Sequence, residues 1–194
     1  KGLVAATPAA EQRFLETALR LAPADARVLL ALWEVYTAQE LHDKALGAAN
    51  AVPADASSAR AARWAVSQSL IALKRLDGAF QELTALYAKA PAASVANALG
   101  VVQLRRGPVA GTQAPAVYFK RAVDADPGNT SYLFNLGYAQ ALAPNPTEAL
   151  ASLREAVRFN PADGDAHLVV KVASVPHPVA RRFVQGAHLV IGVG

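Results

Sequence analysis

The sequence predicts an all-α protein, a solenoid of helical hairpins with about four repeats and a half-repeat at each end. The first observation is that the chain repeats its helix endings, as in "ETALRLAPADA", "KRAVDADPGNT" and "REAVRFNPADG". The second is composition: 53% of the residues are hydrophobic and 18% are charged, with Ala, Leu and Val dominating. Such a composition suits closely packed amphipathic helices with small residues at their contacts.

The helix endings recur at a nearly constant interval. The predicted endings stand at positions 23, 57, 91, 127 and 161, which gives intervals of 34, 34, 36 and 34 residues. Four of them are proline and one is Ser57. Proline has no backbone N–H and ends a helix, so each ending marks a turn between units. A fixed period of this length indicates an array of helical hairpins.

The clearest repeat spans 130–163, "TSYLFNLGYAQALAPNPTEALASLREAVRFNPAD". Its characteristic positions are Leu133, Leu136 and Gly137 on the first helix, then Ala149, Leu153, Ala156 and Pro161 on the second. This pattern resembles the tetratricopeptide repeat (TPR) family, a 34-residue helix–turn–helix unit. The resemblance implies a right-handed solenoid. Small residues at Gly137 and Ala149 let the two helices approach closely, while Leu153 fills the gap between them.

Three looser copies precede it, at 26–59, 60–93 and 93–129, so we expect TPR-like repeats over 26–163. In the first of these copies Trp33 stands where the family has a small residue, and Pro53 shortens the second helix. The third copy carries a longer loop between its helices, "RGPVAGTQAP".

Both ends of the array look like half-repeats. Residues 1–25 hold a lone second helix at 9–21, while 164–194 hold a lone first helix at 164–174 and then an irregular apolar tail. One interpretation is a terminus without functional meaning. The other is that these segments pack on another copy or domain, because a missing first helix and a missing second helix are complementary. The residues expected at these self-assembly ends are Phe14, Leu15, Leu168, Val169 and Val172.

Chemistry-bearing patterns are scarce, so we expect a protein without enzymatic activity, cofactor or metal. The chain has no cysteine, its four histidines are scattered, and no glycine-rich phosphate loop follows a strand pattern. A net charge of +4 is too small and too dispersed to indicate nucleic-acid binding. No apolar stretch is long enough to span a membrane.

The resemblance also implies a groove lined by the first helices of successive repeats. The groove positions are Arg27, Leu30, Glu34, Trp64, Gln68, Asn97, Val101, Arg105, Phe134, Asn135 and Tyr138. Two alternatives stay open: Trp64 and Phe134 could be core residues, and Asn97 and Asn135 could hydrogen-bond neighbouring repeats. Arg105 is expected at a helix C-terminus, where the helix dipole favours a cation.

The predicted function is a protein–protein interaction scaffold, and three hypotheses remain for what it binds. The first is a peptide or domain held in the groove, within a larger polypeptide. The second is head-to-tail self-assembly into rings or filaments through the half-repeat ends. The third is a polyanion or glycan bound by Arg181, Arg182 and the groove aromatics. The Ala-rich chain looks bacterial and begins at Lys1 without methionine, which suggests a processed protein or a fragment. Its compartment is left open, extracytoplasmic and cell-surface locations included.

Overall fold

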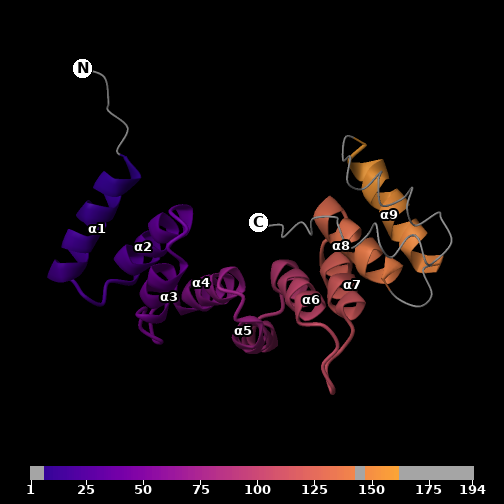
Figure 1. Ribbon diagram of the computed structural model, residues 1–194, viewed down its shortest axis with the longest axis horizontal. Coiled ribbons are helices and arrows are strands. Elements are labelled where there is room, and N and C mark those ends of the chain that lie inside the picture. The colour runs from indigo at the N-terminus through magenta and orange to yellow at the C-terminus, as the bar shows by residue number, and fades with distance from the viewer. Residues whose placement is uncertain (1–6, 143–146, 162–194) are drawn as a thin grey trace. The chain divides into compact units, whose positions relative to one another are not determined.

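The computed structural model describes residues 7–142 and 147–161, and all the regular structure in these ranges is α-helical (Figure 1). The described helices, in chain order, are α1 (Pro8–Leu21), α2 (Ala26–Ala38), α3 (His42–Asn50), α4 (Ala59–Ala72), α5 (Leu76–Lys89), α6 (Ala93–Arg106), α7 (Pro115–Ala125), α8 (Thr130–Ala141) and α9 (Thr147–Phe159). The chain divides into two compact units, Lys1–Leu86 and Tyr87–Gly194, with the boundary inside α5.

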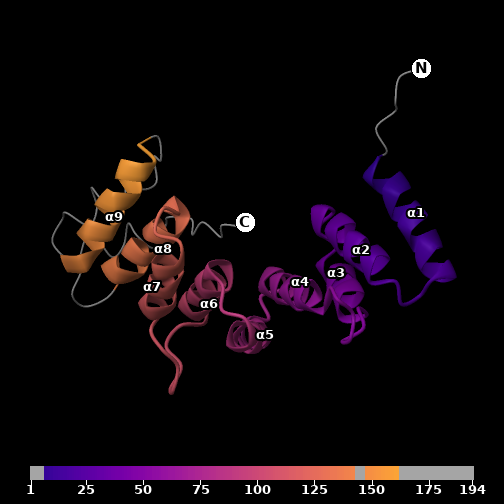
Figure 2. The same ribbon diagram turned by 180° about the vertical axis from the view of Figure 1, so that it is seen from behind.

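In unit 1, helices that follow one another in the chain pack side by side. α1 packs on α2, α2 on α3 and α3 on α4, and the views from both sides agree (Figures 1 and 2). The first helices of successive repeats, α2 and α4, also touch directly. At the surface, a 3.1 Å ion pair links Arg63 of α4 to Glu82 of α5, and another of 3.1 Å links Arg75, in the turn before α5, to Asp43 of α3.

The two hairpin turns of unit 1 share one backbone conformation. Glu40, between α2 and α3, and Lys74, between α4 and α5, each have a φ of 58°. The amides of the residues that follow, Leu41 and Arg75, each bond back to a helix carbonyl at 2.8 Å. Two non-glycine residues 34 positions apart therefore adopt the same left-handed turn, which repeats the period of the sequence.

In unit 2, two hairpins close around glycine. α6 packs on α7 and α8 on α9, and α8 also contacts α7 and α6. A Cβ on Gly100 would lie 2.6 Å from Phe119 Cε1, and one on Gly137 would lie 2.5 Å from Leu153 Cγ. Only glycine therefore permits this approach, as the repeat pattern predicts for Gly137 and Leu153.

The helix bounds match the sequence-based expectations closely. The lone helix predicted at 9–21 is α1, and α3 ends at Asn50, three residues before Pro53, as expected for a shortened second helix. The long loop of the third copy lies between α6 and α7. The expected first helix at 164–174 and the tail to 194 lie outside the described residues.

Candidate interaction surfaces

Helix α1 is held against α2 by one apolar face and one polar link. Thr7 caps its N-terminus, and Leu15 and Leu19 pack on the core cluster that contains Leu32 and Tyr36. The Tyr36 hydroxyl donates to Glu16 Oε1 at 3.0 Å, and the Gln12 amide donates to the same oxygen at 2.8 Å.

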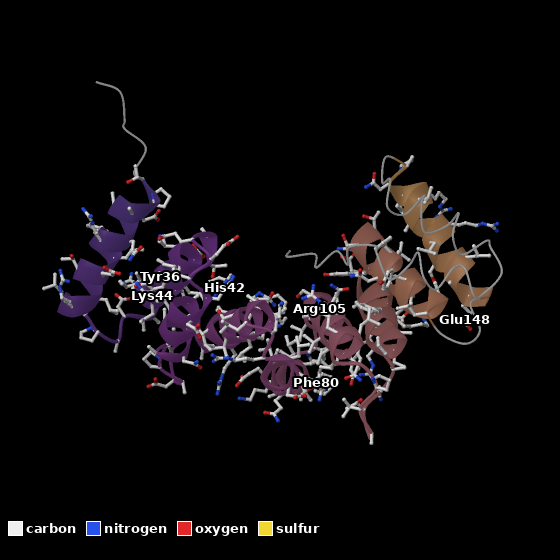
Figure 3. The ribbon with its side chains drawn as sticks, viewed as in Figure 1. Tyr36, His42, Lys44, Phe80, Arg105 and Glu148 are labelled. Carbon is white, nitrogen blue, oxygen red and sulfur yellow. The ribbon has the colours of Figure 1, made fainter. Side chains whose placement is uncertain are left out.

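These hydrogen bonds change the acidity of both partners. The bonds from Gln12 and Tyr36 lower the pKa of Glu16, because they stabilise its carboxylate. Burial raises the pKa of Tyr36, and the bond to Glu16 adds to the shift. The ammonium of Lys44 lies 5.6 Å from the centre of the Tyr36 ring (Figure 3). The neutral hydroxyl of Tyr36 on α2 thus joins the first complete hairpin to α1 by a hydrogen bond to the charged carboxylate of Glu16.

The opposite side of α1 exposes large apolar side chains. Phe14 is 73% exposed and Leu21 is 85% exposed. Phe14 lies nine residues before the helix ending at Pro23. At the same distance from their endings, Ala48 of α3 and Tyr118 of α7 are each 9% exposed, and the polar residues Glu82 of α5 and Ser152 of α9 are half-buried. The residues that lie eight positions before each helix ending also differ in exposure between α1 and the other second helices. Leu15 is half-buried, whereas its counterparts are all fully buried: Ala49, Leu83, Phe119 and Leu153.

The difference in exposure accompanies a difference in the helices described beside each position. Ala48 and Tyr118 belong to second helices that pack on the first helix of their own hairpin, α2 and α6. Among the described residues, no first helix precedes α1 in its repeat. Its Phe14 face is therefore an open helix-packing surface of the kind that a neighbouring helix covers elsewhere in this molecule.

The structure corrects a large part of the predicted groove. Asn97, Val101, Phe134, Asn135 and Tyr138 are all buried, at 5% exposure or less. The amide of Asn135 donates to Asn97 Oδ1 at 2.9 Å, which confirms the alternative that these two residues link neighbouring repeats. Because α8 packs against α6, α7 and α9, its side chains point into the unit on several sides.

The remaining groove residues are accessible to different degrees. Arg27, Glu34 and Arg105 are exposed, and Leu30, Trp64 and Gln68 are half-buried. Arg27 forms a 3.1 Å ion pair with Asp25, and Arg105 lies in the last turn of α6 as expected (Figure 3). Within the described part of the chain, the side-chain nitrogen of Gln68 is buried without a hydrogen-bond partner. Of the other predicted residues, Leu168, Val169, Val172, Arg181 and Arg182 lie outside the described ranges.

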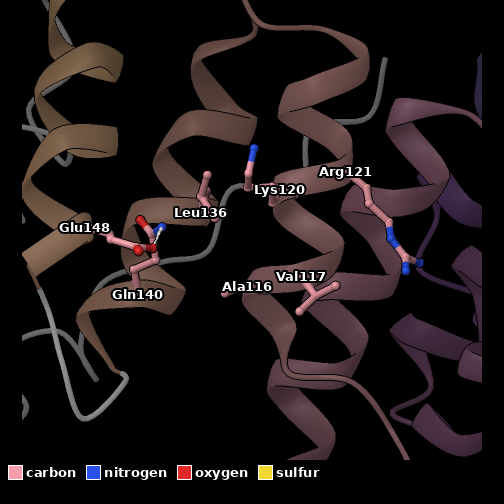
Figure 4. A pocket seen from close by; sticks show the side chains of 7 residues that line it. All are labelled: Ala116, Val117, Lys120, Arg121, Leu136, Gln140 and Glu148. Carbon is pink, nitrogen blue, oxygen red and sulfur yellow. Dashed lines mark hydrogen bonds between the residues drawn. The ribbon is translucent and has the colours of Figure 1, made fainter.

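A hollow of about 430 Å³ in unit 2 was not predicted from the sequence. Residues of α7, α8 and α9 line it (Figure 4): Ala116, Val117, Lys120, Arg121, Leu136, Gln140 and Glu148. Gln140 is fixed at the rim, since its amide nitrogen donates to Glu148 at 3.2 Å and its oxygen accepts from the Ser152 hydroxyl at 2.9 Å. Lys120 pairs with Asp124 at 2.8 Å.

One small residue explains the hollow. Ala116 lies eleven residues before its helix ending, and the corresponding residues of α3, α5 and α9 are Leu46, Phe80 and Leu150. Leu46 packs between α3 and α4 against Ala49, Ala65 and Val66. Ala116 occupies the same place between α7 and α8 but fills less of it. The sequence signal that could have revealed the hollow is an alanine in α7 at a repeat position where α3, α5 and α9 have large apolar residues.

The described residues show no further kind of site. Over 7–142 and 147–161 no three His, Cys, Asp or Glu side chains are grouped so that they could hold a metal ion. Nor is any helix in these ranges both long and apolar enough to cross a membrane.

Repeated helical hairpins, two of them closed by glycine contacts, define a repeat protein of the TPR fold class. Solved structures confirm this fold. YrrB, described as a TPR protein with an unusual peptide-binding site, is 20% identical with a TM-score of 0.67, covering 82% of this chain and 81% of its own. A MamA structure from Desulfovibrio magneticus is 18% identical with a TM-score of 0.71, covering 81% and 88%. A thermophilic TPR protein of Thermus thermophilus, TTC0263, is 20% identical with a TM-score of 0.65, covering 86% and 90%.

These similarities concern the fold, and sequence comparisons add nothing to them. No family model matches the chain, and no curated protein matches it. The resemblance to the TPR family is therefore confirmed at the level of the all-α, helical-hairpin architecture.

Proposed function

We propose that this chain is a non-enzymatic protein–protein interaction scaffold that associates with further copies of itself through the open face of α1. The observation that carries the proposal is the 73% exposure of Phe14, at a repeat position where the apolar residues of α3 and α7 are 9% exposed and the polar residues of α5 and α9 are half-buried. Burying large apolar side chains such as Phe14 and Leu21 supplies about 25 cal/mol per Å² of apolar surface removed from water. The exposed face thus has a driving force for association.

The proposal includes a partner surface for α1. The sequence assigns this role to the expected first helix at 164–174, with Leu168, Val169 and Val172 facing α1 of the next copy. A contact between two different surfaces is heterologous, so it produces rings if it closes and filaments if it does not. Self-association of this kind needs no chemistry beyond complementary apolar faces.

Light scattering coupled to gel filtration tests the proposal. The wild-type chain should show a mass that rises with concentration, and Phe14→Glu should remove that rise because it places a charge in the apolar contact. The matched control is Val109→Glu, which changes an exposed apolar residue in the loop before α7. Deleting 164–194 should abolish assembly if the tail helix covers α1. A Phe14→Glu variant that assembles like the wild type would contradict the proposal.

A second candidate function is supported by the half-buried pair Trp64 and Gln68, one turn apart on α4. Trp64 offers an apolar surface to a peptide, and the buried nitrogen of Gln68, which has no hydrogen-bond partner among the described residues, would have to turn outward to donate to a peptide carbonyl. Binding of the chain to a peptide array, lost in both Trp64→Ala and Gln68→Ala, would support this groove. Binding that survives both changes would exclude it.

The third hypothesis, a polyanion or glycan ligand, depends on Arg181 and Arg182, which lie outside the described residues. Retention on a heparin column should fall steeply with salt if it is correct. The Arg181→Ala/Arg182→Ala double variant should then elute earlier, and unchanged elution would contradict a role for these arginines.

A further inference from the structure

We propose that the hollow between α7, α8 and α9 is a receptor for Phe14 of a second copy of this chain. The inference rests on the proposed self-association through α1 and names a receiving surface inside the described residues. It is an alternative to the tail helix at 164–174 as the partner of α1, and the two can be separated by experiment.

The shapes of the two surfaces fit. Ala116 and Leu46 each lie eleven residues before the ending of their helix. The hollow therefore occupies the place that the Leu46 side chain fills between α3 and α4. Its floor is Leu136 and its wall includes Val117, which is 40% exposed (Figure 4). At about 430 Å³ it has room for one large side chain. Phe14, the most exposed aromatic residue described, projects from a helix that can lie over the hollow as a knob over a hole.

The charges on both sides favour one way of docking. At 100° per residue, Glu11 and Arg13 lie on opposite flanks of the α1 face that carries Phe14, each within one turn of it. Around the hollow, Lys120 lies on the α7 side and Glu148 on the α9 side (Figure 4). Docked α1 can therefore bring Glu11 toward Lys120 and Arg13 toward Glu148.

Each rim charge already has a local contact, which the docked helix would share. Lys120 pairs with Asp124, and both side chains are mostly exposed. Glu148 accepts from Gln140, and the Arg121 guanidinium lies 5.7 Å from the Tyr118 ring centre. Exposed pairs of this kind exchange partners readily, so they set orientation and specificity while the apolar contact supplies affinity.

The contact would be heterologous because its two surfaces differ. α1 belongs to unit 1 and the hollow to unit 2, so every copy carries one knob and one receptor. Copies then join head to tail, and the assembly closes into a ring or extends as a filament.

Filling the hollow is the most direct test. Ala116→Leu introduces the side chain found at the equivalent position of α3, so the variant should unfold at a temperature no lower than wild type and lose self-association by about tenfold or more in the dissociation constant. Ala125→Leu, the same change at an exposed position of α7, is the matched control and should associate like wild type. Sedimentation velocity over a concentration series provides the measurement.

A charge exchange tests the orientation independently of the hollow's packing. Glu11→Lys and Lys120→Glu should each weaken association, and the double variant should recover most of the loss, because the pair is restored with reversed signs. A double variant that is as weak as the sum of both changes would overturn the proposed orientation.

The outcomes separate the two proposals. If Phe14→Glu abolishes assembly while Ala116→Leu and the charge variants assemble like wild type, α1 is the donor but the hollow is not its receptor. If deletion of 164–194 leaves assembly intact and Ala116→Leu abolishes it, the hollow is the receptor. A wild-type chain that stays monomeric at all concentrations would overturn both proposals.

Discussion

Hairpins α2/α3 and α8/α9 make the same close contact with opposite choices of residue size. In α8/α9 the first helix provides Gly137 and the second provides Leu153, whose Cγ would lie 2.5 Å from a Cβ on the glycine. In α2/α3 the corresponding positions hold Trp33 and Ala49, and Trp33 packs on the cluster formed by Ala49, Ala65 and Val66. The repeat therefore constrains the summed volume across the contact, and either helix can supply the large side chain.

The same two regions also differ in how they join successive repeats. In unit 1 the Trp33 indole nitrogen donates to Ser69 Oγ at 3.0 Å, from α2 to α4. In unit 2 the Asn135 amide donates to Asn97 Oδ1 at 2.9 Å, from α8 to α6. Each link is one side-chain hydrogen bond between first helices, partly buried in the first case and fully buried in the second. Its loss should therefore cost more in unit 2.

The largest expected effect is that of Trp33→Ala. The change removes the large partner of Ala49 and leaves two small residues facing each other, so unit 1 should lose about 3 kcal/mol of unfolding free energy. Urea unfolding followed by fluorescence reports this unit, because Trp64, the second tryptophan of the chain, also lies in it. Ser69→Ala, which removes only the hydrogen bond, should cost about 1 kcal/mol. Equal losses for the two variants would contradict a packing role for Trp33.

Gly137→Ala should destabilise unit 2 by about 2 kcal/mol despite alanine's higher helix propensity, because the new methyl group overlaps Leu153. Gly47→Ala is the control, since nothing lies within 4 Å of its added Cβ, and it should stabilise by about 0.5–1 kcal/mol. Urea unfolding followed by circular dichroism distinguishes the two signs. Adding Leu153→Ala to Gly137→Ala should cost less than the sum of the single changes, because the overlap is gone.

Asn97→Ala should cost about 1–2 kcal/mol, because it takes a buried acceptor away from the Asn135 amide. The effect should exceed that of Ser69→Ala, which breaks the partly buried link in unit 1. The same urea titrations provide both values. A smaller loss for Asn97→Ala than for Ser69→Ala would show that burial does not set the strength of these links.

The smallest effect is expected at the link between α1 and α2. The pKa of Glu16 is lowered in the folded chain by Gln12 and Tyr36, so its stabilising contribution is present above the pKa of the unfolded chain and is lost as the pH falls through the lower folded value. Glu16→Gln should lower the unfolding temperature slightly at about pH 7, and this difference should shrink as the pH falls through the folded pKa of Glu16. Tyr36→Phe should show the same disappearance at low pH. A difference that persists in acid would contradict this link.

The sequence predicted the elements of the fold because local signals determine them. Proline endings located the second helices, and the pairing of Gly137 with Leu153 followed from the repeat period. The period also located the helix that is observed as α1. These features depend on backbone chemistry and spacing, which can be read without knowing the tertiary contacts.

The predicted groove was less successful because its residues depend on tertiary contacts. Phe134, Asn135 and Tyr138 follow one another so closely on α8 that only packing decides which side chain faces outward. Nine residues of α8 are buried, and its segment carries no charged residue, which is the pattern of a helix covered on most sides. That absence of charge was the available signal. To predict the hollow at Ala116 from the sequence, the residues at equivalent positions of the different repeats would have had to be compared.

We propose that copies of the chain associate through the exposed face of α1. Sedimentation equilibrium of the wild-type chain and of Phe14→Glu over a wide concentration range tests it most directly. For the wild type, the weight-average mass should rise above 20.2 kDa with concentration, and for the variant it should stay at the monomer value. A wild-type mass that remains at 20.2 kDa throughout would contradict it.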